Sequence, residues 1–443
     1  MARLHIPAFI NYRCQACGRC CHDYEVTLSQ AEYERLHSYD WANIFPQLAG
    51  RQLFERSHRA DAAGPYRIHF DATRGCSFLA EDGRCLMHAH VGYKNKGLAC
   101  RLFPFTFAAA PDGIYVGMRF NCAAVARGWG EPLQRQREDI EALWEAVSRR
   151  GQLRPFPTHV AFSTSQIIPW RDYLVAERVF LNVLLRPDLA LPDRIEVFWR
   201  AISLMREARL DRVSGARFPE FMALITQGVA SEMARDTALC LPGPVTRALF
   251  RQILFLLHRR TPSAITTLGL RRRITERLAA SADATRFLLK RGRSRLHGQT
   301  EYFLLQAVEQ VPLPDLTPEV SGILERYLAA KLFGKQIFGP MFFNYDFVRG
   351  CAFLLGVFAA IPWYARARAL SRGADAATEG DIAHAVEYVD FTCGYSDFPA
   401  LVSERLRLRL LARGDVPLQL VRAQCAPWWR QASQARAAAE VPA

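Results

Sequence analysis

The sequence of 443 residues lacks the motifs of the common nucleotide-dependent enzymes. It has no G-x-G-x-x-G that opens a helix after a strand, which argues against a dinucleotide-type Rossmann site and against a glycine-rich S-adenosylmethionine loop. It also lacks the C-x3-C-x2-C triplet of radical S-adenosylmethionine enzymes, because Cys17 and Cys21 have the first spacing but no cysteine follows at the next step. Any catalytic site must therefore use residues that these generic motifs do not reveal.

Long apolar runs are also missing. The segment Met1–Pro7 has no extended apolar region, so we expect no signal peptide. The longest apolar stretch, residues 351–365, contains Pro362 and is shorter than the ~20 residues that a membrane-spanning helix needs. We therefore expect a buried helix in this stretch and a soluble, cytoplasmic protein.

Acidic residues are fewer than basic ones, and the formal net charge is +14. A basic surface can attract nucleic acid, anionic lipid or an acidic protein. No aromatic-interleaved nucleic-acid motif accompanies the charge, and its local concentrations are Arg271–Arg273 and Lys290–Arg295. We interpret the excess as the solvated faces of arginine-rich helices.

Cysteine is scarce after residue 122 and dense before it. Four of the twelve cysteines stand alone in apolar or helical surroundings, where we expect inert, buried thiols: Cys240, Cys351, Cys393 and Cys425. The other eight are the candidate metal ligands: Cys14, Cys17, Cys20, Cys21, Cys76, Cys85, Cys100 and Cys122. Eight sulfurs are what two four-sulfur sites would require.

The densest group is the C-x2-C-x2-C-C run from Cys14 to Cys21. Its spacing fits either a disulfide knot or a metal or iron–sulfur site. A chain of 50.2 kDa can bury a large core without disulfide staples, and a C-x2-C loop directs two sulfurs at one centre, so we predict a metal site. We expect a positive φ at Gly18. The adjacent Cys20 and Cys21 either serve different centres or include a spare thiol.

Histidines near the cysteines offer an alternative set of ligands, because imidazole binds zinc and iron. His22 follows the vicinal cysteines, and His88 and His90 follow Cys85. We favour a role in hydrogen bonding to sulfur or simple exposure to water, because eight cysteines already complete two sites. We expect Arg101, next to Cys100, to offset thiolate charge.

The pattern of apolar residues predicts a mainly α fold, with a small, irregular, cysteine-rich domain over residues 1–130 and an α-helical domain over residues 131–443. In the first domain, Ser29 and Glu32 form a capping-box pattern at the start of a helical stretch. Residues 65–71 alternate as a short strand does, residues 81–84 predict a turn with Cys76 and Cys85 on two hairpin arms, and Pro111–Gly113 predicts another turn. In the second domain, we predict helices over residues 134–150, 173–185, 194–210, 220–239, 246–258, 274–290, 302–310, 319–333, 381–389 and 400–411, and a frayed tail over residues 431–443.

The order of the cysteines resembles the YkgJ-type family of zinc- or iron-chelating cysteine-cluster domains over residues 9–125. The resemblance depends on the C-x2-C-x2-C-C run, Cys76-Ser-Phe-Leu, Cys85-Leu-Met-His, Cys100-Arg-Leu-Phe-Pro104 and Cys122. It implies that the eight cysteines are metal ligands. Lys96-Gly97 stands where such domains often have Arg-Pro, which keeps the positive charge and loses the rigid proline.

The length and the helical tail resemble, more loosely, the flagellin lysine N-methylase (FliB-type) branch. This resemblance implies a protein lysine N-methylase that uses S-adenosylmethionine and acts on a protein such as flagellin. Two further hypotheses remain: a non-enzymatic module that stores, delivers or senses iron or zinc, and a zinc-stabilised protein-interaction protein. We favour an iron–sulfur cluster (4Fe–4S) over zinc, because the ligands span about a hundred residues and a helical domain of some 300 residues follows.

Overall fold

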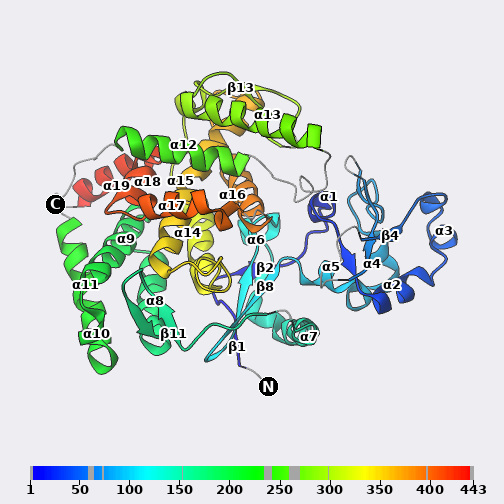
Figure 1. Cartoon of the computed structure of the whole chain (residues 1–443), viewed down its shortest axis with the longest axis horizontal. Coiled ribbons are helices and arrows are strands. Elements are labelled where there is room, and N and C mark those ends of the chain that lie inside the picture. The colour runs from blue at the N-terminus through cyan, green and yellow to red at the C-terminus, as the bar shows by residue number, and fades with distance from the viewer. Residues whose placement is uncertain are drawn as a thin grey trace.

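The computed structural model describes residues 3–57, 64–71, 74–151, 153–233, 242–258, 270–297, 299–395 and 398–439. It confirms the mainly α fold, in which a small strand-rich region with the cysteines is followed by helical segments (Figure 1). The cysteine-rich lobe lies on the right of Figure 1, and the helices form the larger body on the left. Cys240 lies outside the described residues.

The cysteine-rich lobe consists of short elements. Its strands are β3 (Thr27–Leu28), β4 (Phe54–Arg56), β5 (Tyr66–Ile68), β6 (Phe70–Asp71) and β7 (Gly75–Cys76). Its helices are α1 (Arg19–Asp23), α2 (Gln30–His37), α3 (Trp41–Ile44), α4 (Leu86–Val91) and α5 (Leu98–Leu102). The predicted capping box is present at the start of α2, where Ser29 N donates to Glu32 Oε2 at 2.8 Å and Glu32 N donates to Ser29 Oγ at 3.3 Å. The helical pattern after Thr27 therefore produces two short helices between strands.

A three-stranded sheet pairs the start of the chain with the two strands that follow the cysteine-rich lobe. The strand β1 (Leu4–His5) runs parallel to β9 (Gly113–Met118), which pairs antiparallel with β8 (Phe105–Ala110). The predicted turn at Pro111–Gly113 connects β8 and β9. The helix α6 (Ala123–Arg127) follows, and β2 (Asn11–Tyr12) pairs with β10 (Glu131–Pro132).

The remainder of the chain is predominantly helical. Its longer helices are α7 (Arg137–Ser148), α8 (Trp170–Leu184), α9 (Leu191–Glu207), α11 (Phe218–Met233), α12 (Pro244–His258), α13 (Leu270–Leu289), α14 (Pro318–Phe333), α15 (Phe347–Ser371), α16 (Glu379–Tyr395), α17 (Val402–Leu411), α18 (Val416–Gln424) and α19 (Ala426–Ala439). A short helix, α10 (Leu210–Val213), and two hairpins interrupt them: β11 (His159–Ala161) with β12 (Ile167–Pro169), and β13 (Arg293–Ser294) with β14 (Phe303–Leu304).

The helix predicted over residues 302–310 and the frayed tail predicted from residue 431 both differ from the structure. Residues 302–310 form β14 and a 3-10 turn instead of a helix, because Phe303 pairs with Ser294 in a hairpin. The tail from residue 431 continues as α19 to Ala439, where Arg436 pairs with Asp193 of α9 and buried Trp428 donates to Pro314 O at 2.8 Å. Tertiary contacts therefore determine both segments.

The helix α15 contains the apolar stretch that we predicted to be a buried helix. It is long and apolar enough to cross a membrane, but 94% of its most apolar window is buried inside the protein. Its neighbours are α16, α17 and α18, which surround it in the centre of the helical body (Figure 1). This burial is that of a core helix.

The buried apolar residues form two clusters. The larger one combines the helices with residues 4–12 and 98–126, including fully buried Ile10, Val116 and Phe120. The smaller one lies within the cysteine-rich lobe, around Leu36 and Phe78. The domain boundary near residue 130 stays a prediction, while the packing places the sheet β1-β9-β8 in the core that it shares with the helices.

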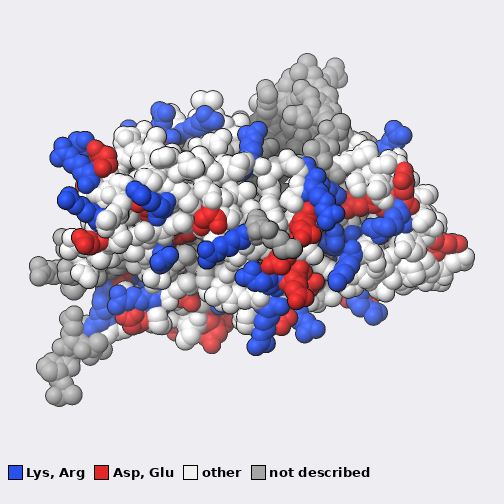
Figure 2. Space-filling model, turned by 90° about the horizontal axis from the view of Figure 1, so that it is seen from below, with Lys and Arg blue, Asp and Glu red and all other residues white. Residues whose placement is uncertain are grey.

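The charged side chains on the face shown in Figure 2 are mixed. Lys and Arg lie among Asp and Glu across that face and do not form one large basic area. Lys290, at one predicted concentration of charge, pairs with Glu309. This arrangement fits the solvated helix faces that we expected.

Candidate metal centre

The helix α1 carries the vicinal cysteines, and a left-handed turn starts it. Gly18 has φ 70°, as predicted, and a side chain there would meet Leu79 and the backbone of Gly83. Cys21 N then donates to Gly18 O at 2.9 Å, and Tyr24 N donates to Cys20 O at 3.1 Å. The turn therefore fixes the C-x2-C-C segment as one short helical unit.

Gly75 brings Cys76 next to α1. Its φ is +80°, and a Cβ there would lie 2.7 Å from Cys21 O and 2.9 Å from His22 Nδ1. Only glycine combines this backbone conformation with so close an approach. The strand β7 can consequently lie against α1, which places Cys76 beside Cys21.

Cys85 is positioned by a tight turn. Ala80 N donates to Arg84 O at 2.9 Å, and Leu79 and Cys85 form an antiparallel bridge. Cys85 then caps α4, where its Sγ accepts from His88 N at 3.4 Å. The predicted turn is present, but Cys76 is not on its other arm, because it pairs with Phe70 in β6.

Cys100 lies on α5, and the half-buried carboxylate of Glu32 attaches this helix to α2. Leu98 N donates to Glu32 Oε1 at 2.6 Å, and Arg150 Nη2 donates to Glu32 Oε2 at 2.7 Å. Burial raises the pKa of Glu32, but the hydrogen bonds from Ser29 N and Leu98 N and the charge of Arg150 outweigh it and hold the pKa below its usual value. Glu32 therefore stays ionised and keeps Cys100 in place.

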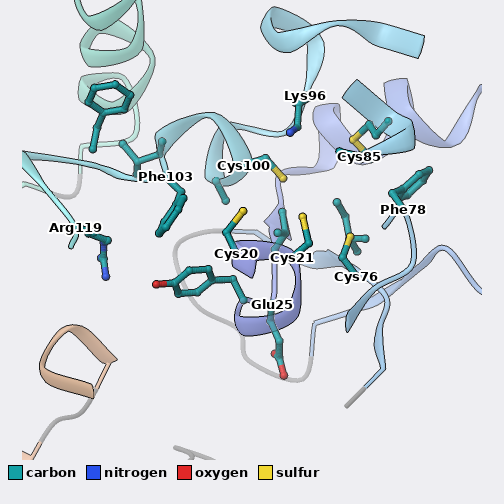
Figure 3. A pocket seen from close by; sticks show the side chains of 17 residues that line it. Cys20, Cys21, Glu25, Cys76, Phe78, Cys85, Lys96, Cys100, Phe103 and Arg119 are labelled. Atoms are coloured by element: carbon teal, nitrogen blue, oxygen red, sulfur yellow. The ribbon is translucent and has the colours of Figure 1, made fainter. Parts of the chain in front are cut away.

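These elements surround one cavity of about 230 Å³ (Figure 3). Five thiols line it: Cys20, Cys21, Cys76, Cys85 and Cys100. The remaining wall is mostly apolar and includes Phe78, Met87 and Phe103. Thiols from four separate segments of the chain thus face a common space.

Two cations line the same cavity, and the sequence reasoning did not select either. The Lys96 side chain points toward the sulfurs in Figure 3, and Arg119 lies at the end beyond Phe103. Burial lowers the pKa of Lys96, but the thiols of Cys85 and Cys100 raise it by more. Arg101, which we expected to offset thiolate charge, does not line the cavity. A signal for Lys96 was available, since it occupies the position of the family's Arg.

Burial keeps the thiols of Cys76 and Cys100 protonated unless a cation joins them. It raises the pKa of Cys76 and of Cys100 to about 12. Metal binding requires thiolates, so a bound cation would release these protons, and Lys96 would offset part of the resulting charge. All cysteines in the described ranges are free, which removes the disulfide knot as an explanation of their spacing.

The donor set fits a thiophilic metal, although the sulfurs do not surround a point. Among the described residues, no three His, Cys, Asp or Glu side chains have the arrangement of a bound metal ion. Four sulfurs at ~2.3 Å from one zinc ion would lie about 3.8 Å from each other. The five thiols instead face a cavity much larger than one ion.

The other predicted ligands lie elsewhere. Cys14, Cys17 and Cys122 do not line the cavity, and Cys14 and Cys17 are exposed. The three candidate histidines, His22, His88 and His90, are exposed and do not line the cavity either. His90 contacts the rings of Tyr39 and Trp41 edge-on. The structure therefore brings together five of the eight predicted cysteines at this cavity and places three outside it.

A comparison with protein families matches the residues that form this site. No curated protein and no solved structure matches the chain significantly. One family model matches residues 13–123, about a quarter of the chain, and this range contains all eight clustered cysteines. The matched family is CxxCxxCC, described as a putative zinc- or iron-chelating domain, and residues 13–123 are the part of the chain that is similar to it.

Proposed function

We propose that residues 13–123 bind an iron–sulfur cluster of the 4Fe–4S type in the cavity, with Cys21, Cys76, Cys85 and Cys100 as ligands. The observation that carries the proposal is the convergence of free thiols from four segments on one cavity of about 230 Å³. Four cysteine thiolates are the usual ligands of such a cluster. The family model supports the coarser statement that this domain chelates zinc or iron.

The shape of the site favours a cluster over a single zinc ion. Structural zinc is enclosed by four sulfurs at ~2.3 Å, and such an arrangement leaves no space of this size between them. A cluster separates its cysteine ligands and therefore suits thiols that face a larger space. The buried rings of Phe78 and Phe105 limit the access of water to this space.

The chain's own residues have separate parts in this proposal. The backbone of α1 and the close approach at Gly75 hold Cys21 and Cys76 side by side. Lys96 offsets the negative charge of the thiolates, and Glu32 fixes the helix of Cys100. When bound, the cluster would supply electron transfer or an iron site for a substrate.

Anaerobic purification of the full chain tests the proposal. We expect a brown, oxygen-sensitive protein with about four iron atoms and four acid-labile sulfides per cavity. Cys85→Ser should lose most of this iron and sulfide, while Cys351→Ser, at a buried thiol on α15, should retain both. Stoichiometric zinc without sulfide in the anaerobic preparation would contradict the proposal and favour a structural zinc site.

We further propose that the centre serves catalysis, with protein lysine N-methylation as the reaction. The support is the resemblance of the layout to the flagellin lysine N-methylase branch and the extension of the cavity beyond the sulfurs, past Tyr24 and Phe103 to Arg119. The test is methyl transfer from radiolabelled S-adenosylmethionine to flagellin by the reconstituted protein, with Cys85→Ser as control. Equal labelling by both proteins would refute a role of the centre in the transfer, and no labelling by either would favour a non-enzymatic iron- or zinc-binding module.

A further inference from the structure

The hairpin of β13 and β14 follows α13 at the edge of the helical body, at the top of Figure 1. The two strands pair antiparallel, with Arg293 opposite Leu304 and Ser294 opposite Phe303. Successive side chains along a strand lie on opposite faces. One face of the hairpin therefore carries Ser294 and Phe303, and the other carries Arg293 and Leu304.

The first of these faces packs on the helical core. Phe303 is buried, and the centre of its ring lies 6.2 Å from that of Trp363 on α15. Ser294 Oγ forms a hydrogen bond with His258 Nε2 at 3.1 Å. Phe287 of α13 contacts the same Trp363 ring at 5.8 Å between centres. Both α13 and the hairpin thus rest on α15, and the opposite face of each points away from it.

The outer face of the hairpin combines cations with exposed apolar side chains. Arg293 and Arg295 are exposed. On the neighbouring segment, Tyr302 and Leu304 are 60% and 43% exposed. The Arg295 guanidinium lies over the Tyr302 ring, 5.2 Å from its centre. This face therefore offers apolar contacts and positive charge within one small area.

The outer side of α13 continues the apolar surface. Leu278 and Leu289 are 66% and 59% exposed, and about three helical turns separate them, so they lie on the same side of the helix. Ala282 and Thr285, between them on this side, are exposed and uncharged. Phe287 lies on the opposite side, against α15. An uncharged stripe thus runs along α13 toward the hairpin.

The charge of this surface is positive. Lys290 is neutralised by Glu309, with which it forms an ion pair. The segment from residue 291 to residue 304 then has only one acidic residue, Glu301. Its three arginines are all exposed: Arg291, Arg293 and Arg295. The excess of positive charge lies next to the exposed leucines and the tyrosine.

We propose that α13 and the hairpin bind the surface of an anionic lipid membrane. Four apolar side chains enter the boundary between the headgroups and the acyl chains: Leu278, Leu289, Tyr302 and Leu304. The arginines contact the lipid phosphates. A nucleic acid would use the arginines and the Tyr302 ring but would leave the leucines in water, whereas a membrane interface accommodates both groups. The contact is peripheral, and α15 stays in the core of the protein.

Sedimentation of the full chain with lipid vesicles tests this inference. We expect binding to vesicles made of equal parts of phosphatidylcholine and phosphatidylglycerol, much weaker binding to phosphatidylcholine alone, and release as salt rises, because salt screens exposed charges. An arginine near an anionic membrane contributes about fivefold in affinity, so loss of all three should weaken binding about 100-fold. This triple variant carries Arg291→Gln, Arg293→Gln and Arg295→Gln. A double variant, Leu289→Ser with Leu304→Ser, should weaken binding about tenfold through lost apolar contact.

Matched variants at exposed positions elsewhere separate this surface from the effect of net charge. A control triple variant loses the same charge through Arg84→Gln, Arg186→Gln and Arg209→Gln. Leu224→Ser, on α11 at a side chain that is 69% exposed, is the apolar control. Both controls should bind vesicles like the parent protein. All these changes are at exposed side chains, so the variants should keep the circular dichroism of the parent.

Hydrogen exchange locates the contact, because amides in residues 289–304 should exchange more slowly on anionic vesicles. Absence of binding to these vesicles at low salt, unchanged binding of the triple variant, or an equal loss in the control triple variant would overturn the proposal. Binding to a double-stranded DNA fragment that needs the same three arginines, together with full vesicle binding by the leucine double variant, would overturn it in favour of a nucleic-acid surface.

Discussion

Replacement of Glu387 by Gln removes the one carboxylate that α16 presents to two arginines of the cysteine-rich part. Gln has nearly the same shape, so the packing of α16 against α6 is preserved and the change is in charge. Arg127 is 23% exposed and Arg19 is 41% exposed, and Glu387 itself is almost completely buried. The positive charge of Arg368 also acts on Arg127 and lowers its pKa after the larger effect of burial. The variant therefore leaves several like charges close together.

The size of the effect follows from this exposure. Loss of one partner from a fully buried ion pair costs about 3–5 kcal/mol, because the other charge stays in a dry environment. Water screens Arg19 in part, so we expect the lower end of that range, about 3 kcal/mol. Because Arg19 stands between Cys17 and Cys20, the same change should also weaken metal retention by the neighbouring thiols.

Urea unfolding of the metal-loaded chain, followed by circular dichroism, measures the free energy of unfolding of the variant. Asp188→Asn is the matched control, because Asp188 pairs with Arg186 at a site where both side chains are more than half exposed. The control should unfold like the parent protein. A loss of less than about 0.5 kcal/mol in Glu387→Gln would refute the claim that this carboxylate joins the two parts of the chain.

Four other predictions follow from single positions. Gly75→Ala should lower both stability and metal content, because its Cβ would lie 2.7 Å from a carbonyl oxygen; Gly50→Ala, at φ +72° in open space, should leave metal content unchanged in the same metal analysis. Lys96→Met should weaken iron retention against a chelator by roughly tenfold, and Lys96→Arg should restore it, because the charge is what faces the thiolates. Burial lowers the pKa of His258 to about 4, below the ~6.5 of an unfolded histidine, so the unfolded state binds more protons. Stability should therefore be complete above pH 6.5 and fall by about 3 kcal/mol toward pH 4, and His258→Gln should flatten this part of the stability curve. Cys351→Ala should leave metal content intact while its cavity lowers the unfolding midpoint in urea.

Local features of the fold were predictable because their causes are local. The capping box needs only Ser29 and Glu32, and the left-handed turn needs only Gly18 after Cys17. The core helix α15 follows from its run of apolar residues, which are buried in the helical body. The wrong helix at residues 302–310 had a local pattern, but pairing of Phe303 with Ser294 determined its structure.

The candidate site was predictable in its chemistry and not in its geometry. Cysteine density indicated eight ligands, whereas the selection of the five that line the cavity depends on how the separate segments of the lobe pack together. Arg101 follows Cys100 on α5, where adjacent side chains differ by about 100° around the helix axis, and it does not line the cavity. Lys96, which directly precedes the N-cap of α5, faces the thiols across the cavity. Tertiary packing determines these side-chain orientations, so the sequence alone does not predict them.

The pairing of Arg127 with Glu387 also sets an order of events during synthesis. The two residues are 260 positions apart, and translation at about 5–20 residues per second separates them by roughly 13 to 50 seconds. All eight clustered thiols have left the ribosome before the carboxylate that anchors their helices exists. During this interval the cysteine-rich lobe lacks the contact of Arg19 and Arg127 with Glu387 of α16. Delivery of metal in this interval would therefore meet a more open site than the finished protein has.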